Sequence, residues 1–200
     1  MKFETVVLNI ENQIATITLN RPEHLNAGNR QMIDDLLTAF DLCDEDDEVK
    51  AIVVTGEGRA FCAGADISGG SSGFLDSEAS ESANTSSLPP RDIGGLITLR
   101  IYDLKKPIIA AINGAAAGMG VTMTLPMDFR LASNTAKLGF VFAKRGIVPE
   151  SNSSYFLQKT VGITQALDLY DRPNCQCSGS AGKRFSQSTL HPGKFASRRL

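Results

Sequence analysis

Residues 60–67, AFCAGADI, decide how the rest of this 200-residue sequence is interpreted. They follow residues 50–56, KAIVVTG, whose β-branched run and terminal glycine are typical of a buried strand. Small residues after a strand let a ligand approach the backbone closely, and a free backbone N–H group can stabilise a developing oxyanion. A tight loop packed under another element would have the same local pattern, so the stretch leaves both interpretations open.

The composition indicates one globular domain. The apolar fraction of 42% and the charged fraction of 21% are ordinary, and a chain of this length can bury a core. The formal net charge of -2 gives no reason to expect nucleic acid or an anionic membrane as a partner. No run approaches the roughly 18 apolar residues of a membrane span, and the N-terminus lacks a signal-type apolar stretch. We therefore expect an intracellular protein, either cytoplasmic or peroxisomal.

The two ends of the chain differ in charge. Residues 1–170 carry 14 Lys/Arg and 21 Asp/Glu, a net of -7, whereas residues 171–200 carry 6 Lys/Arg and 1 Asp, a net of +5. We expect a folded domain over 1–170 and a divergent, disordered basic tail over 171–200. The four cysteines fit an intracellular thiol protein. The Cys-x-Cys spacing in the tail is tighter than that of zinc sites, so no metal is expected.

Hydrophobic periodicity divides residues 1–170 into strands and helices. Alternation with period two predicts half-buried strands, and steps of three and four residues predict amphipathic helices. The expected strands are 3–10, 13–19, 51–55, 108–112 and 128–132, and the expected helices are 30–43, 93–104, 121–127, 155–161 and 164–170. A stretch rich in Ser, Gly and Pro, about residues 68–95, predicts a mobile loop that flanks the site.

Residues 113–120, NGAAAGMG, form a second small-residue turn, between a strand and a helical stretch. Two such turns with exposed N–H groups favour an oxyanion pocket over simple packing. Glu150 supplies a carboxylate at the expected start of a helix. It is either an acid stabilised by the helix dipole or a partly desolvated group that moves a proton at carbon while the pocket holds an enolate.

Taken together, these segments resemble the crotonase, or enoyl-CoA hydratase/isomerase, superfamily. The resemblance covers about residues 3–170 in the order and spacing of the superfamily, and it is specific as a set. The matching segments are 14–22 (IATITLNRP), 25–27 (LNA), 52–56 (IVVTG), 60–67 (AFCAGADI), 106–114 (KPIIAAING), 126–132 (PMDFRLA) and 146–150 (GIVPE).

This resemblance implies an α/β fold of the ClpP/crotonase type, a spiral of ββα units with two packed sheets and helices around them. It implies an acyl-CoA thioester as the bound partner, its thioester oxygen held by the N–H groups of Ala63 and Met119. Coenzyme A would be part of the substrate, and no cofactor is implied. The residues expected to contact the substrate are Arg21, Leu25, Ala27, Ala63, Gly64, Ala65, Asp66, Ile67, Gly118 and Gly120.

The catalytic positions separate the reactions of the superfamily. Its hydratases use two glutamates, and the matching positions here hold Thr122 and Phe142. Glu150, in contrast, resembles the single catalytic acid of the peroxisomal type of Δ3,Δ2-enoyl-CoA isomerases. One carboxyl group would take a proton from C2 and return it at C4 while the pocket holds the dienolate. The resemblance therefore implies an enoyl-CoA isomerase or hydratase-like enzyme of fatty acid metabolism.

Two alternatives stay open. One is another reaction of the superfamily, such as hydration, thioester hydrolysis or decarboxylation. The other is a catalytically inactive acyl-CoA-binding paralogue, because residues 171–200 do not resemble the C-terminal helices that complete the acyl pocket and pack the trimers of the superfamily. We expect those helices to be missing and the homotrimer or hexamer of the superfamily to be weakened. The ending SRRL, residues 197–200, only loosely resembles a peroxisomal address.

Overall fold

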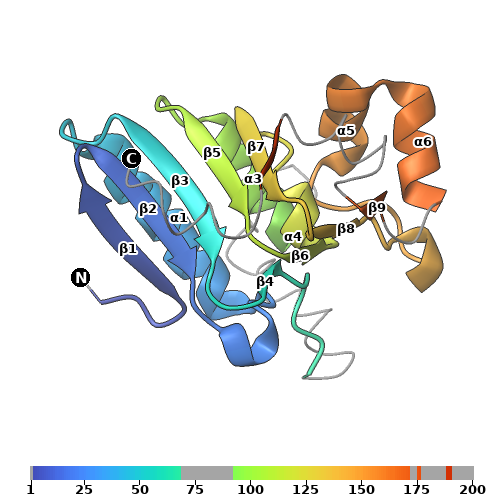
Figure 1. Cartoon of the computed structure of the whole chain (residues 1–200), viewed down its shortest axis with the longest axis horizontal. Coiled ribbons are helices and arrows are strands. Elements are labelled where there is room, and N and C mark those ends of the chain that lie inside the picture. Colours follow the sequence, from blue (N-terminus) through green and yellow to red (C-terminus); the bar gives the residue numbers. More distant parts are fainter. Residues whose placement is uncertain (1, 69–91, 172–174, 177–187, 191–200) are drawn as a thin grey trace, which may run out of the picture.

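The computed structural model describes residues 2–68, 92–171, 175–176 and 188–190, and these form two β-sheets with helices around them (Figure 1). The larger sheet has the strand order β1-β2-β3-β5-β7-β10, and the smaller has the order β4-β6-β8-β9. From β3 to β8, successive strands alternate between the two sheets. This alternation is the spiral of ββα units that the resemblance implies, so the expected α/β crotonase-type fold is confirmed.

The larger sheet begins with the predicted hairpin. Strands β1 (Val6–Glu11) and β2 (Ile14–Leu19) are antiparallel, and Asn12 and Gln13 connect them with positive φ values of 51° and 66°. Such a two-residue turn matches the twist of the flanking strands. The strands β3 (Ala51–Gly56), β5 (Ile108–Ile112), β7 (Phe129–Ser133) and β10 (Ser188–Leu190) continue the sheet in parallel.

The smaller sheet changes the interpretation of the two small-residue stretches. Its strands are β4 (Ala60–Cys62), β6 (Ala115–Ala117), β8 (Lys137–Gly139) and β9 (Cys175–Gln176). Each predicted turn therefore contains a short strand, and β4 pairs in parallel with β6. This pairing brings the two stretches together, which the sequence pattern alone does not indicate.

The helices mostly lie where periodicity predicts them. The described ones are α1 (Arg30–Glu45), α3 (Ile93–Tyr102), α4 (Met119–Thr122), α5 (Ser153–Val161) and α6 (Ile163–Asp171), with 3-10 turns at Pro22–His24 and Ala143–Arg145. The helix expected at 121–127 is wrong in extent, because α4 ends at Thr122. The buried Arg130 guanidinium donates to the carbonyls of Thr124, Leu125 and Met127, so these groups bond to a side chain instead of extending a helix.

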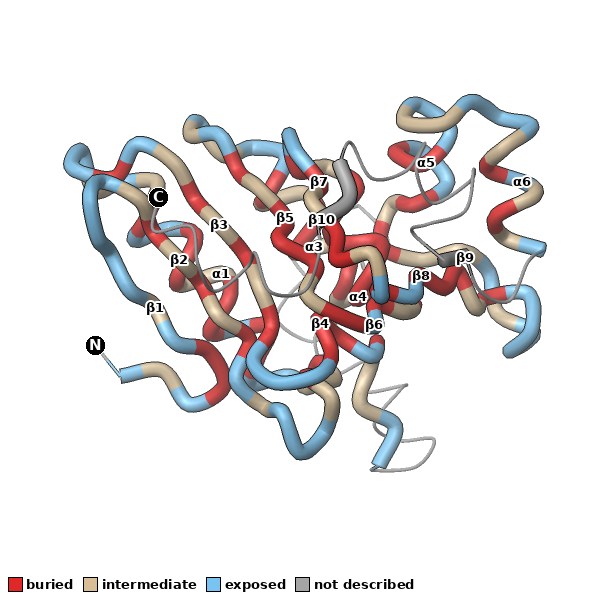
Figure 2. The backbone as a smooth tube through the Cα atoms, viewed as in Figure 1, coloured by how far each residue is buried: buried red, intermediate tan, exposed pale blue. Residues whose placement is uncertain are grey.

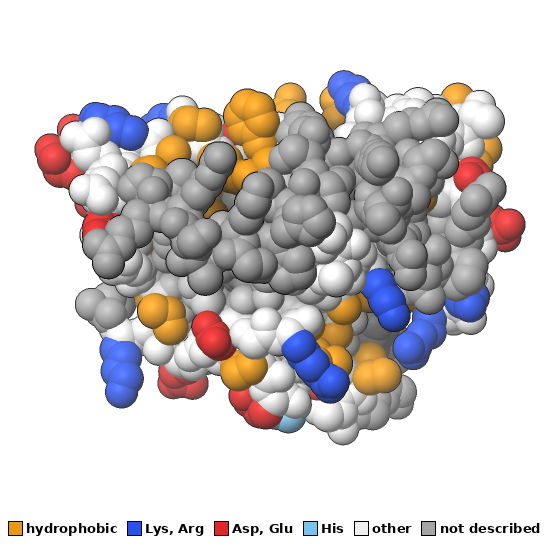
Figure 3. Space-filling view, in the orientation of Figure 1, with side chains coloured by type: hydrophobic (Ala, Val, Ile, Leu, Met, Phe, Trp, Pro, Cys, Tyr) orange, Lys and Arg blue, Asp and Glu red, His pale blue; other side chains and the backbone are white. Residues whose placement is uncertain are grey.

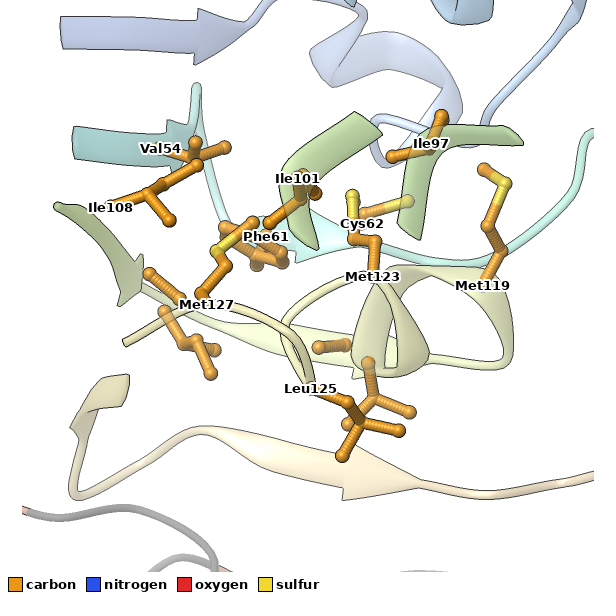
Figure 4. Packing of buried hydrophobic residues seen from close by; sticks show 14 of the residues in the cluster. Val54, Phe61, Cys62, Ile97, Ile101, Ile108, Met119, Met123, Leu125 and Met127 are labelled. Carbon is orange, nitrogen blue, oxygen red and sulfur yellow. The ribbon is translucent and has the colours of Figure 1, made fainter. Parts of the chain in front are cut away.

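The buried apolar side chains form one cluster, which extends from the larger sheet to the smaller one. Figure 4 shows part of it, with Phe61 and Cys62 of β4, Ile101 of α3, and Met119 and Met123 at and after α4. Figure 2 shows that burial is greatest along the middle strands, whereas β1 is largely exposed. Both small-residue stretches are therefore fixed by the core itself.

Two predicted segments lie largely outside the described residues. Of the loop expected at about 68–95, the structure describes Ser68 and residues 92–95, which cap and begin α3. Of the tail expected at 171–200, the described residues are the end of α6 and the short strands β9 and β10. These strands pair with β8 and β7, whose backbone groups would otherwise stay unpaired at a sheet edge.

Candidate active site

A cavity of about 610 Å³ opens between the two small-residue stretches and the segment that leads to α5. Its size is typical of a small-molecule site. The lining residues are His24, Ala27, Ala63, Gly64, Ala65, Asp66, Ile67, Ser68, Gly118, Val141, Phe142, Arg145, Ile147 and Glu150. Segments far apart in the sequence therefore converge on one space.

Glycines allow the two turns to touch. Gly64 has a φ of 106°, and a Cβ atom there would lie 3.0 Å from the carbonyl oxygen of Ala117. At Gly120 a Cβ atom would lie 2.1 Å from the carbonyl oxygen of Cys62, which no rearrangement of a side chain could relieve. The close approach of the backbones therefore depends on the absence of side chains at these two positions.

The structure corrects one of the two oxyanion donors. The Ala63 N–H group, expected to hold the thioester oxygen, donates to the carbonyl of Leu25 at 3.0 Å and is not free. Among the described residues, the N–H groups of Ala65 and Met119 donate no hydrogen bond. Ala65 and Gly118, the residue before Met119, both line the cavity. The unpaired donors are therefore Ala65, in place of Ala63, and Met119.

Strand geometry explains why the free donor is Ala65. Ala65 forms an isolated parallel bridge with Gly28, in which Gly28 donates to Gly64 and Asp66 donates to Gly28, both at 2.8 Å. The N–H groups of successive residues in an extended chain point to opposite sides. The N–H group of Ala65 therefore points away from Gly28, and it has no partner on that side within the described chain.

Arg21 supports the cavity from behind and does not line it. Its guanidinium donates to Asp66 Oδ2 at 2.8 Å and to the carbonyl of Ala27 at 2.5 Å. Asp66 also accepts a hydrogen bond from the Ser68 N–H group. The hydrogen bonds from Ser68, together with the Arg21 ion pair, lower the pKa of Asp66 to about 2. Asp66 is thus ionised and a weak base at neutral pH.

Buried Asn26 fixes the shape of the loop that carries these residues. Its side chain donates to the carbonyls of Glu57 and Ala60, both at 2.9 Å, and accepts from the Arg21 N–H group at 2.9 Å. Leu25 and Asn26 both have left-handed backbone, with φ values of 54° and 56°. Leu25 therefore serves the site through its carbonyl, which accepts from Ala63.

Glu150 is the second carboxylate that lines the cavity, and it is half-buried. Burial raises the pKa of Glu150 above its ordinary value, and the nearby negative charge of Asp92 raises it further. Burial disfavours the ionised form because water no longer solvates the charge. A carboxyl group in this state is a better proton acceptor than an exposed one.

The two positions that match hydratase glutamates hold no carboxylate. Thr122 is fully buried, and its hydroxyl donates to the carbonyl of Met119 at 3.4 Å. Phe142 is 1% exposed and lines the cavity, with its ring 6.3 Å from that of Tyr170. The cavity therefore has an apolar wall where a second glutamate would stand.

The structure brings most of the predicted site together. The predicted residues that line the cavity are Ala27, Ala63, Gly64, Ala65, Asp66, Ile67, Gly118 and Glu150, and those that support it from behind are Arg21, Leu25, Met119 and Gly120. Sequence reasoning missed His24, Ser68, Val141, Arg145 and Ile147. Arg145 and Ile147 lie just before Glu150, so proximity to that motif was an available signal.

Other kinds of site find no support among the described residues. No helix there is long and apolar enough to cross a membrane, and no group of three or more His, Cys, Asp or Glu side chains could hold a metal ion. Figure 3 shows Lys and Arg side chains on the same face as Asp and Glu side chains. The described part of that face is therefore not the single-sign surface that nucleic acids require.

Sequence comparison places these features in a known context. The family model for enoyl-CoA hydratase/isomerase matches residues 9–170. An enoyl-CoA hydratase of Alternaria alternata, AFT3-1, is 44% identical over 157 residues, which are 78% of this chain and 50% of that protein. The 1,2-epoxyphenylacetyl-CoA isomerase of Escherichia coli is 32% identical over 174 residues, covering 83% of this chain and 62% of the relative.

Comparison with solved structures leads to the same family as the sequence comparison. A crystal structure of an enoyl-CoA hydratase subunit from Geobacillus kaustophilus superposes with a TM-score of 0.81 and 30% sequence identity, over 96% of this chain and 71% of that one. The chain spans about half the length of the Alternaria relative. Residues 9–170, which the family model matches, contain both small-residue stretches and Glu150. The chain belongs to the enoyl-CoA hydratase/isomerase family, within the crotonase superfamily.

Proposed function

We propose that this protein is an acyl-CoA enzyme that shifts a carbon–carbon double bond, an enoyl-CoA isomerase. The observation that carries this proposal is the pairing of one half-buried carboxylate, Glu150, with two unpaired backbone N–H groups around one cavity. Asp66 also lines the cavity, but its low pKa and its ion pair with Arg21 make it unsuitable as a base. One competent base suits isomerisation.

The reaction follows from these groups. The N–H groups of Ala65 and Met119 hold the thioester oxygen of a 3-enoyl-CoA. The Glu150 carboxylate takes a proton from C2, and the electron pair of the C2–H bond delocalises into a dienolate whose oxyanion the two donors stabilise. The same carboxyl group then gives that proton to C4, leaving the double bond between C2 and C3. No water is consumed, and Glu150 ends as it began.

Two exposed side chains of the cavity, the cationic Arg145 and the imidazole of His24, are available to the phosphates of coenzyme A. Cationic side chains bind phosphate groups through charge-assisted hydrogen bonds. We propose that the phosphates of an acyl-CoA lie on this side, with the acyl chain against Phe142 and Ile147.

Hydration of a 2-enoyl-CoA is the second candidate. The 44% identical relative from Alternaria alternata carries the name enoyl-CoA hydratase. Against it stand Thr122 and Phe142, because neither can activate water as a carboxylate does. The apolar wall at Phe142 favours isomerisation over hydration.

One assay separates the two reactions. The protein is incubated with a 3-enoyl-CoA and, separately, with a 2-enoyl-CoA, while the absorbance of the conjugated enoyl thioester is followed. Isomerisation makes this absorbance appear with the first substrate, and hydration makes it disappear with the second. Glu150→Gln should abolish isomerisation, and Glu57→Gln, an exposed acid outside the cavity, should not. Unchanged turnover in Glu150→Gln would remove Glu150 from the mechanism.

Three further proposals accompany this function. The reaction requires no cofactor, since coenzyme A belongs to the substrate.

The protein assembles as a homotrimer or hexamer weakened by the divergent tail, which analytical ultracentrifugation would test. It acts in fatty acid metabolism in the cytoplasm or the peroxisome. Residues 197–200 lie outside the described structure, and a fluorescent fusion with and without them would locate the protein.

A further inference from the structure

The start of helix α3 lies directly against the turn that presents Glu150. Asp92, the N-cap of α3, accepts the N–H group of Gly95 at 2.9 Å and that of Ser151 at 3.0 Å, both through Oδ2. The first hydrogen bond caps the helix. The second extends to the residue next to Glu150, across 59 positions of sequence. A single carboxylate oxygen thus joins α3 to the catalytic segment.

A second contact reinforces this junction. The Asn152 side chain donates to Thr98 Oγ1 at 2.9 Å and to the carbonyl of Gly95 at 3.3 Å. The fit is close, because a Cβ atom at Gly94 would lie 2.0 Å from Ser151 Oγ. Gly94, at the start of α3, therefore allows the turn to pack against the helix.

The turn itself is held in an unfavourable conformation. Ser151 and Asn152 both have left-handed backbone, with φ values of 57° and 54°. This region is costly for residues other than glycine, although Asn tolerates it. Strain of this kind persists where neighbouring contacts over-determine the backbone. Here those contacts come from α3, through Asp92 and Thr98.

Helix α3 is in turn fixed to α1. Arg100 donates to Asp41 at 2.6 Å and to Asp44 at 3.2 Å, and the Lys105 N–H group donates to Asp44 at 2.9 Å. The helix also contributes Ile97 and Ile101 to the core. Asp92 therefore acts from a rigid support.

Among the charged groups near Glu150, Asp92 is the negatively charged one without an ion-pair partner in the described structure. The other titratable groups that line the cavity are His24, Asp66 and Arg145. Asp66 is neutralised by Arg21, and His24 and Arg145 are exposed to solvent, which screens them. Asp92 forms no ion pair within the described chain, and its known partners there are backbone N–H groups. No cationic side chain of the described residues therefore pairs with its negative charge beside Glu150.

We propose that Asp92 is a positioning residue of this site, which fixes the turn that presents Glu150 and places a negative charge next to its carboxyl group. This inference rests on the proposed role of Glu150 as the base. The charge of Asp92 disfavours the ionised form of Glu150 and so raises its pKa, beyond the effect of burial. A raised pKa strengthens the carboxylate as a base at C2.

Two variants separate the charge from the geometry. Asp92→Asn and Asp92→Ser remove the charge but keep an oxygen that caps the helix, since Asn, Asp and Ser are comparable N-caps. Asp103→Asn is the matched control, because Asp103 lies at the other end of α3. The helix separates them by about 15 Å, beyond the screening length of about 8 Å at physiological ionic strength.

The first measurement is the titration of Glu150 in the whole protein. Carboxyl carbons of 13C-labelled glutamate are followed by NMR, and the Glu150 signal is the one missing in Glu150→Gln. We expect Asp92→Asn and Asp92→Ser to lower the pKa of Glu150 and Asp103→Asn to leave it unchanged. An unchanged pKa in both Asp92 variants would overturn the proposal. This measurement holds even if Glu150→Gln retains activity, an outcome that would contradict the proposed function instead.

The second measurement is the pH dependence of kcat/KM for the 3-enoyl-CoA. The acidic limb, where Glu150 becomes protonated, should move to lower pH in Asp92→Asn and stay in place in Asp103→Asn. Asp92→Ala, which removes the contact to Ser151 as well, should lower kcat by about 100-fold, the effect of a misplacement of about 1 Å. A kcat equal to that of the unaltered protein in Asp92→Ala would refute the positioning role.

Discussion

On one side of the cavity, the reactive groups are the backbone N–H groups of Ala65 and Met119; on the other side, the reactive group is the side chain of Glu150. The backbone side is built from β4 and β6 and continues into the hydrophobic core. The Glu150 side is a turn held by a few polar contacts to α3. Under the proposed function, the backbone side holds the thioester oxygen, and the Glu150 side chain determines which reaction follows.

The largest effect should come from a substitution that removes only the reactive group on the Glu150 side. Glu150→Gln keeps the shape of the carboxyl group but removes the base, and we expect kcat to fall by about 10²- to 10⁴-fold. The dissociation constant for an acyl-CoA should stay unchanged, because the backbone donors remain. Stopped-flow kinetics and calorimetry measure the two quantities. A loss of binding equal to the loss of turnover would show that the two sides are not separable.

A substitution on the backbone side should lower the stability of the fold as well as the affinity for acyl-CoA. Gly120→Ala places a Cβ atom against the carbonyl of Cys62, so β4 and α4 must move apart. We expect the free energy of unfolding to fall by about 3 kcal/mol and acyl-CoA binding to weaken with it. Urea denaturation measures the first.

Gly146→Ala is the matched control for this substitution. Gly146, unlike Gly120, has a positive φ, of 65°, but a Cβ atom there would meet nothing within 4 Å. Its cost should be limited to the left-handed backbone, about 1 kcal/mol. Equal destabilisation by the two substitutions would contradict the importance of the contact with Cys62.

The two sides of the cavity also differ in how far the sequence predicts them. Local patterns identify helix α1, the small-residue stretches and five strands of the larger sheet, since alternation in β2 and the apolar stripe of α1 are read within one element. They miss every strand of the smaller sheet, because these strands are only two or three residues long. The free donor is Ala65 and not Ala63 because of hydrogen bonds to Leu25 and Gly28, which are remote in sequence. The Asp92–Ser151 contact is likewise non-local. Periodicity describes one element at a time and carries no information on such pairs.

A smaller effect should come from breaking the Arg21–Asp66 ion pair, which supports the backbone side from behind. Arg21→Met leaves Asp66 without its ion pair in a site where both side chains are largely buried, 13% and 12% exposed. We expect a loss of about 2 kcal/mol in unfolding free energy and a rise in the pKa of Asp66 from about 2 toward its ordinary value. Urea denaturation and NMR titration measure these changes.

The control for Arg21 is an exposed ion pair of the same chemistry. Arg30 bonds to Asp34 one turn along α1, with side chains 60% and 48% exposed. Arg30→Met should cost only about 0.3 kcal/mol, because solvent screens the pair. If both substitutions cost the same, burial of the Arg21–Asp66 pair would not account for its contribution.

The smallest effect should come from Asp35, a carboxylate that belongs to neither side of the cavity. Asp35 of α1 holds the N-terminal segment, because it accepts from Thr5 Oγ1 at 2.7 Å and from the N–H groups of Glu4 and Thr5. Burial alone would raise the pKa of Asp35, but its hydrogen bonds together outweigh burial and lower it. The stabilisation is therefore complete above the ordinary pKa of about 4 and is lost as the pH falls through the lower folded-state value.

Asp35→Asn should remove about 1 kcal/mol of unfolding free energy at pH 7 and should flatten the decrease of stability between neutral and acidic pH. Urea denaturation over this range measures both, with the exposed Asp47→Asn as control. The kinetics with a 3-enoyl-CoA should stay unchanged, because Asp35 does not line the cavity. A shift in the acidic limb of kcat/KM in Asp35→Asn would mean that the charge near Glu150 is not local, and it would weaken the distinction between the two sides of the cavity.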